Sequence, residues 1–179
     1  GKFISKNITT LGDKASGVGT LNLTDDISTF DTVGLNVGNS GNGIVNIRSG
    51  ATLNSPGYGF IGGNTSGKGI VNVSTGSLWN LTAPNSNAQL LQVGVFGTGE
   101  LNITSGGVVQ ARDTQVALND RSQGSVRVEG KDSLLETFNM NVGTTGQGTL
   151  TLTNNGILSV LGGEVYLGVF EPAVGTLNI

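Results

Sequence analysis

A short glycine-centred unit recurs along the whole chain, and no other feature of the sequence constrains the fold as strongly. Its clearest copy is Gly97-Thr98-Gly99-Glu100-Leu101-Asn102-Ile103, where two aliphatic residues alternate with polar ones after the second glycine. With that second glycine as the marker, the copies fall at Gly19, Gly43, Gly69, Gly99, Gly124, Gly148 and Gly175. Successive steps of 24, 26, 30, 25, 24 and 27 residues are typical of a solenoid with one unit per turn.

The alternation within the unit predicts a short strand with one buried face. Its two aliphatic columns are Leu21, Val45, Val71, Leu101, Val126, Leu150, Leu177 and Leu23, Ile47, Val73, Ile103, Val128, Leu152, Ile179. The residue between the two aliphatics must point outward, because side chains alternate along a strand. That outward column reads Asn22, Asn46, Asn72, Asn102, Arg127, Thr151 and Asn178.

Two further strands are expected in each unit. One carries the aliphatic pairs that begin at Leu35, Leu91, Met140 and Val165, and it places Phe60 and Tyr166 outward. Another follows the glycine unit, with an inward column of Thr29, Leu53, Trp79, Val109, Leu134 and Leu158. The corner between them is expected at Asp26, Gly50, Gly76, Gly106, Lys131 and Asn155, mostly residue types that tolerate positive φ.

Three strands per turn and aliphatic columns inside predict an all-β fold, a right-handed parallel β-helix of about seven coils. Residues 1–179 are expected to form this single β-helix without an internal domain boundary. A seven-bladed propeller is excluded, because each blade needs roughly 40–45 residues. Residues 81–89 and 111–123 interrupt the pattern and are interpreted as inserted loops, the places where binding sites usually lie on a rigid scaffold.

Composition excludes several functions. The chain has no His and no Cys, so neither a Ser-His-Asp triad nor a histidine-containing zinc site is possible. A net charge of −3 lacks the basic footprint that nucleic-acid binding requires. No cofactor or metal motif is present, and no apolar run is long enough to span a membrane. The expectation is a non-enzymatic protein. Asp113, Asp120 and Glu136 would be the acids of the alternative, a polysaccharide-active enzyme.

Three segments resemble one repeat family: residues 69–79 (GIVNVSTGSLW), 91–94 (LQVG) and 97–109 (GTGELNITSGGVV). They are similar to the passenger repeats of bacterial autotransporters, the type V secretion family that includes AIDA-like adhesins. The resemblance implies an exported passenger on the bacterial cell surface, held at the outer membrane only through a C-terminal barrel domain outside this sequence. It carries over no catalytic residues, because the matching positions are core and corner positions.

The resulting functional hypothesis is a surface adhesin or self-association segment, involved in cell adhesion, biofilm formation or virulence. The expected partner is a host or neighbouring-cell ligand, a glycan or a matrix protein, or a second copy of the chain. The candidate binding residues are Asn46, Asn72 and Asn102 of the outward column, with Asn85, Asn87 and Gln89 of the loop. The alternatives are the enzyme described above and a passive stalk that lifts another domain from the surface.

Overall fold

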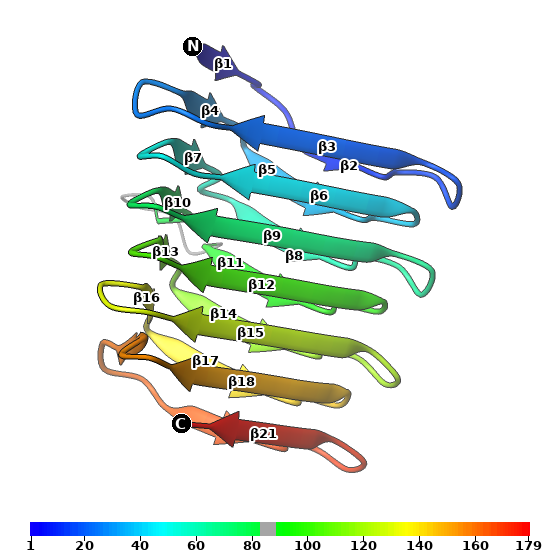
Figure 1. Cartoon of the computed structure of the whole chain (residues 1–179). Helices are drawn as coiled ribbons and strands as arrows, with labels where there is room; N and C mark the ends of the chain where they lie inside the picture. Colours follow the sequence, from blue (N-terminus) through cyan, green and yellow to red (C-terminus); the bar gives the residue numbers. More distant parts are fainter. Residues whose placement is uncertain (83–88) are drawn as a thin grey trace.

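The computed structural model describes residues 1–82 and 89–179. These residues form twenty-one strands and no helix, arranged in three seven-stranded parallel sheets (Figure 1). Sheet A contains β1 (Lys2–Ile4), β4 (Thr29–Asp31), β7 (Thr52–Asn54), β10 (Leu78–Asn80), β13 (Val108–Gln110), β16 (Leu134–Thr137) and β19 (Ile157–Val160). Sheet B contains β2 (Thr9–Leu11), β5 (Gly34–Val37), β8 (Tyr58–Ile61), β11 (Leu90–Val93), β14 (Asp113–Val116), β17 (Asn139–Val142) and β20 (Val165–Leu167).

Sheet C contains β3 (Val18–Leu23), β6 (Asn42–Ile47), β9 (Lys68–Ser74), β12 (Thr98–Thr104), β15 (Gln123–Glu129), β18 (Gln147–Thr153) and β21 (Val174–Asn178). The chain passes from sheet C to A to B and then starts the next coil, winding as a right-handed parallel β-helix (Figure 1). The predicted fold is therefore confirmed. We number the coils by their sheet C strands, so β3 lies in the first coil and β21 in the seventh.

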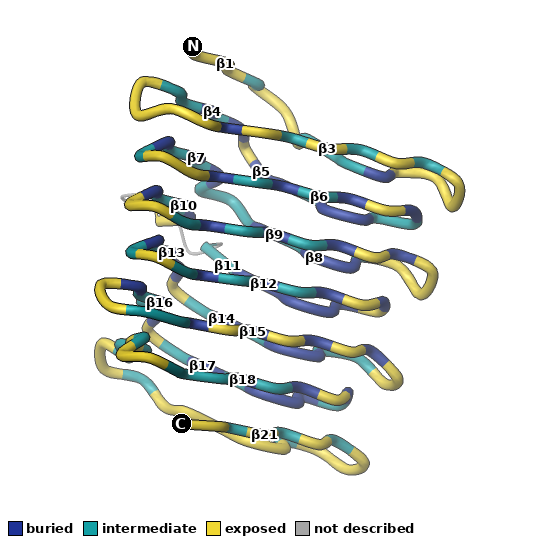
Figure 2. The backbone as a smooth tube through the Cα atoms, viewed as in Figure 1, coloured by how far each residue is buried: buried dark blue, intermediate teal, exposed yellow. Residues whose placement is uncertain are grey.

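The register of sheet C follows the glycine unit. All seven marker glycines, from Gly19 to Gly175, are Cα partners across adjacent strands. Both aliphatic columns point inward, and in the second to fifth coils all of their members are at most 1% exposed. One continuous core runs from Leu23 to Leu150, whereas the first and last coils are more exposed (Figure 2).

The sheet A column was predicted correctly in four coils and wrongly in two. The inward residues are Phe30 and Leu135, which pair with Leu53 and with Val109 and Leu158, in place of the predicted Thr29 and Leu134. Counted from the second aliphatic residue of the sheet C strand to the inward residue of sheet A, the step is seven residues in these two coils and six in the others. A shift of one residue moves every side chain of a strand to the opposite face.

The same two coils depart at the predicted corner. Positive φ is found as expected at Gly50, Gly76, Gly106 and Asn155. It is absent at Asp26 and Lys131, so those two predictions are wrong; near Lys131, Gly130 and Asp132 adopt positive φ instead. An extra residue lets the chain turn through different dihedral angles. In the fifth coil the left-handed residues lie elsewhere in the corner, and in the first coil residues 24–28 turn without any positive φ.

The second predicted insert is not an insert, because residues 113–116 form strand β14 of sheet B. Thr114 occupies the inward column between Leu91 and Met140, and it is 1% exposed. Its hydroxyl donates to Oγ1 of Thr137 at 3.0 Å, which satisfies a polar group inside the core. The strand was not predicted, because the alternation pattern relied on an aliphatic residue in this column and the chain has a threonine there.

Trp79 is a core residue, as its inward column predicted. Its side chain is fully buried, and its indole Nε1 donates to Oγ of Ser55 at 2.8 Å. Gly59 of β8 leaves the space for the ring: a Cβ built on Gly59 would lie 2.4 Å from Cζ2 of Trp79. The indole of Trp79, which belongs to sheet A, therefore occupies the interior space that Gly59 of sheet B leaves free because it has no side chain.

Candidate binding surfaces on sheets C and B

The outer face of sheet C carries a ladder of four asparagines, one per coil. The amide Nδ2 of Asn46 donates to Oδ1 of Asn22 at 2.8 Å. Asn72 donates in the same way to Asn46 at 2.9 Å, and Asn102 to Asn72 at 3.0 Å. The parallel register places one asparagine directly above the next at the spacing of the strands. Asn46, Asn72 and Asn102 are thus brought together, on the outer face where the alternation placed them.

The amide groups of the ladder form many of their hydrogen bonds with one another. Asn72 uses both its amide nitrogen and its carbonyl oxygen on neighbouring rungs, and Asn102 also donates to Oε1 of Glu100 at 2.6 Å. The rungs Asn46, Asn72 and Asn102 are half-buried. Together with Arg48, Ser74 and Thr104 they line an open depression of about 410 Å³. The ladder is therefore a rigid, polar surface. Most of the amide groups that are not used in bonds between its rungs lie at its two ends.

Charges on this face are separated along the helix axis. Arg48 follows β6 in the second coil and Lys68 begins β9 in the third; both are exposed. Glu100 lies on β12 in the fourth coil, and Glu129 ends β15 in the fifth. Arg127 of β15 is paired with Glu129, with Nη2 to Oε2 at 2.6 Å. The second and third coils of this face thus carry only positive charges, whereas the fourth and fifth coils carry two carboxylates and Arg127, a net charge of −1.

Of the three predicted loop residues the structure describes only Gln89, and Gln89 does not join the ladder. Asn85 and Asn87 lie outside the described residues. Gln89 directly precedes β11 of sheet B, and its carbonyl oxygen accepts a hydrogen bond from the backbone nitrogen of Arg112 at 3.0 Å. Gln89 therefore lies at the start of a sheet B strand, while Asn46, Asn72 and Asn102 point outward from sheet C.

The three candidate acids are not brought onto one face. Asp113 lies on β14 of sheet B and Glu136 on β16 of sheet A, while Asp120 follows β14 in the turn before sheet C. Each has a local partner: Asn139 for Asp113 at 2.6 Å, Gln110 for Glu136 at 3.0 Å, and Arg121 for Asp120 at 3.7 Å. Among the described residues, no group of three or more Asp and Glu side chains is arranged to hold a metal ion.

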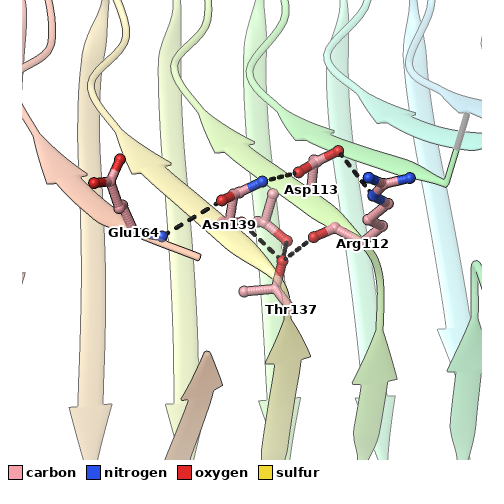
Figure 3. Close-up of polar contacts among 6 residues, drawn as sticks. Arg112, Asp113, Thr137, Asn139 and Glu164 are labelled. Carbon is pink, nitrogen blue, oxygen red and sulfur yellow. Dashed lines mark hydrogen bonds and ion pairs between the residues drawn. The ribbon is translucent and has the colours of Figure 1, made fainter. Parts of the chain in front are cut away.

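A second polar surface, which the sequence did not predict, lies on the outer face of sheet B. Figure 3 shows part of it, a row of contacts across neighbouring strands. Nδ2 of Asn139 donates to Oδ1 of Asp113 at 2.6 Å, and Nε of Arg112 lies 4.0 Å from Oδ2 of the same carboxylate. The hydroxyl of Thr137 donates to the backbone oxygens of Arg112 and Asn139 at 3.1 and 2.8 Å. These bonds fix the positions of Asp113 and Asn139.

Beside this row, Asp113, Gln115, Asn139, Asn141, Leu90 and Tyr166 line most of an open depression of about 440 Å³. Tyr166 is 49% exposed, as its outward position predicted. Its hydroxyl donates to Oε2 of Glu164, and this hydrogen bond, with the negative charge of Glu164, raises the pKa of Tyr166 above its ordinary value. The signal for this surface was present in the columns Asp113/Asn139 and Gln115/Asn141/Tyr166, which become visible only when β14 is recognised.

The architecture and its polar outer columns define the class of this protein, a parallel β-helix with side-chain ladders on its faces. No protein-family profile matches the chain, and no solved structure matches it. A curated relative is the "Uncharacterized lipoprotein YdeK" of Escherichia coli (strain K12), 78% identical over 155 residues. The match covers 87% of this chain and 12% of the relative, so the chain spans about an eighth of that protein's length. None of the described residues forms a helix long and apolar enough to cross a membrane.

Proposed function

We propose that the chain is an adhesive segment of a longer, autotransporter-like surface protein, and that it associates with a second copy of itself through the outer face of sheet C. The observation that carries this proposal is the arrangement of charge along that face, with Arg48 in the second coil and Glu129 in the fifth, next to a rigid asparagine ladder. The name of the E. coli relative, a lipoprotein, supports a place at a membrane surface.

Antiparallel pairing suits the geometry of the face. A two-fold axis that runs along the strands, between the third and fourth coils, keeps each side chain in its own column and reverses the order of the coils. Arg48 of the second coil then faces Glu129 of the fifth coil in the other copy, and Asn72 faces Asn102. The pair of opposite charges occurs twice in the dimer, because the two-fold axis repeats it. Weak contacts of this kind add up when two cells each display many copies of the chain.

A charge swap tests the pairing. We expect Arg48→Glu and Glu129→Arg each to weaken dimerisation of the purified chain by about tenfold, because each places like charges opposite one another. The double variant restores the attraction and is expected to dimerise like the original chain. Analytical ultracentrifugation measures dimerisation, and settling of cells that display the chain measures aggregation.

Arg121→Glu is the matched control, since Arg121 is 93% exposed and lies off this face. Its dimerisation should stay unchanged. A double variant that associates no better than the two single variants would contradict the proposed pairing. A folded chain that neither dimerises nor aggregates cells would indicate a passive stalk instead.

A further inference from the structure

We propose that the depression on the outer face of sheet B is a binding site for an uncharged oligosaccharide. The site combines an exposed aromatic ring, a row of amides whose hydrogen-bonding groups are partly without partners, and a carboxylate held in place by its neighbours. It lies on a different face from the sheet C surface, and it does not depend on the self-association proposed above.

The polar groups of the depression are held in place and still have capacity to bind. Asp113 and Asn139 are fixed by the contacts of Figure 3. Among the described residues, the side chain of Asn141 makes no hydrogen bond. Gln115 accepts one from Nε2 of Gln92 at 2.6 Å, which leaves its own Nε2 unspent. This surface differs from the asparagine ladder of sheet C. There, both the amide nitrogen and the carbonyl oxygen of Asn72 are hydrogen-bonded to neighbouring rungs.

The spacing and shape suit a sugar. Gln115 and Asn141 are Cα partners on adjacent strands, and Asn141 is in turn the partner of Tyr166. Amides on adjacent strands therefore stand about 4.8 Å apart, a separation at which both can reach hydroxyl groups of one pyranose ring. Tyr166, 49% exposed at the end of the row, offers an aromatic surface with a polar tip. The volume of about 440 Å³ lies within the roughly 300–1,000 Å³ of small-ligand sites.

The charge of the lining selects an uncharged ligand. The residues around the depression include one carboxylate, Asp113, and no cationic side chain. Arg112 lies at the rim, 4.0 Å from that carboxylate, and Glu164 accepts the hydroxyl hydrogen of Tyr166. An acidic polysaccharide would bring carboxylates against Asp113 and Glu164, which costs free energy through like-charge repulsion. Sugar hydroxyl groups, by contrast, can donate to Asp113 and both donate to and accept from the amides.

The test uses the whole chain and two sets of purified sugars. Isothermal titration calorimetry with cellohexaose, maltohexaose, laminarihexaose, mannohexaose and chitohexaose covers uncharged glycans, and hexagalacturonate covers acidic ones. We expect at least one uncharged hexasaccharide to bind. Tyr166→Ala is expected to raise its Kd about tenfold, the loss of one stacking partner, whereas Tyr166→Phe keeps the ring and changes the Kd less than threefold.

Phe170→Ala is the matched control, because Phe170 is an aromatic residue of the same coil, 61% exposed and outside the depression. It should bind as the original chain does. Asn141→Ala provides a second probe in the centre of the site, with an expected loss of about fivefold from one or two hydrogen bonds. Failure of all five uncharged sugars to bind, preference for hexagalacturonate, or equal loss in Tyr166→Ala and Phe170→Ala would overturn the proposal.

Discussion

At the scale of single residues, the fold depends on a few pairs in which one side chain fills the space that another leaves. Trp79 lies over Gly59, and its indole nitrogen reaches Ser55. Tyr58 lies over Gly34 in the same way, since a Cβ on Gly34 would be 2.7 Å from its ring. At these two positions a glycine on the neighbouring strand leaves the space that the ring occupies.

Gly59→Ala tests the first of these pairs. The added methyl group would lie 2.4 Å from the buried indole, so the ring or the strand must shift. We expect the free energy of unfolding to fall by about 1–3 kcal/mol, the usual cost of overpacking. Urea unfolding followed by far-ultraviolet circular dichroism measures it. The cost should shrink in a Trp79→Leu background; an equal cost in both backgrounds would show that the indole is not responsible.

At the scale of elements, each strand is stabilised by columns of like side chains on successive coils. The asparagine ladder of sheet C is one of several, with counterparts in Asn54 and Asp31 of sheet A (2.7 Å) and Gln92 and Gln115 of sheet B (2.6 Å). Ladders on all three faces indicate that such columns support the stacking of coils in general. A polar column is therefore weak evidence for binding by itself. It becomes stronger evidence where a side chain lacks a hydrogen-bond partner among the described residues, as Asn141 does, or where the charges are arranged to match a partner, as along sheet C.

Asn72→Ala measures what the ladder contributes. It removes the bond to Asn46 and the bond from Asn102, whereas Asn22→Ala at the end of the ladder removes only the bond from Asn46. We expect Asn72→Ala to lower the free energy of unfolding by about 1–2 kcal/mol, roughly twice the effect of Asn22→Ala. Fluorescence of the single, buried Trp79 during urea unfolding provides the measurement. Equal effects of the two substitutions would mean that the hydrogen bonds contribute little to stability.

At the scale of the whole molecule, stability comes from stacking between adjacent coils. Central coils have neighbours on both sides, and Leu101 and Val128 are fully buried there. In the seventh coil Leu177 is only partly buried, and Ile179 is 94% exposed. The free energy of opening should therefore rise from the ends of this chain toward its centre.

Hydrogen exchange checks this gradient. Amides of β12 and β15 should exchange slowest, and those of β20 and β21 fastest, by a factor of at least 100. Leu101→Ala is expected to lower global stability by about 2–5 kcal/mol, because it leaves a cavity in the continuous core. Leu177→Ala, in a partly exposed position, should cost about 1 kcal/mol or less. Uniform protection along the chain would instead indicate a single cooperative unit.

The path of the chain could be predicted from residue spacing: the glycine steps and the two aliphatic columns indicated the coils, the parallel stacking and the outward asparagines. These features are visible because side chains alternate along a strand and identical positions stack from coil to coil. The predictions failed where one residue was added at a corner, at Thr29 and Leu134, and where Thr114 replaced an aliphatic residue in the core.

Which polar side chains meet, and which of their groups remain available for a ligand, depends on contacts between coils that residue spacing does not specify. Asp113 and Asn139 are 26 residues apart, and their contact exists because β14 and β17 are adjacent in sheet B. The ladder residues Asn46 and Asn72 proved to bond to each other, which the outward positions alone could not show. Hydrogen bonds are short-ranged and directional, so a pattern of spacing predicts the face on which a side chain lies but not the partner that it finds there.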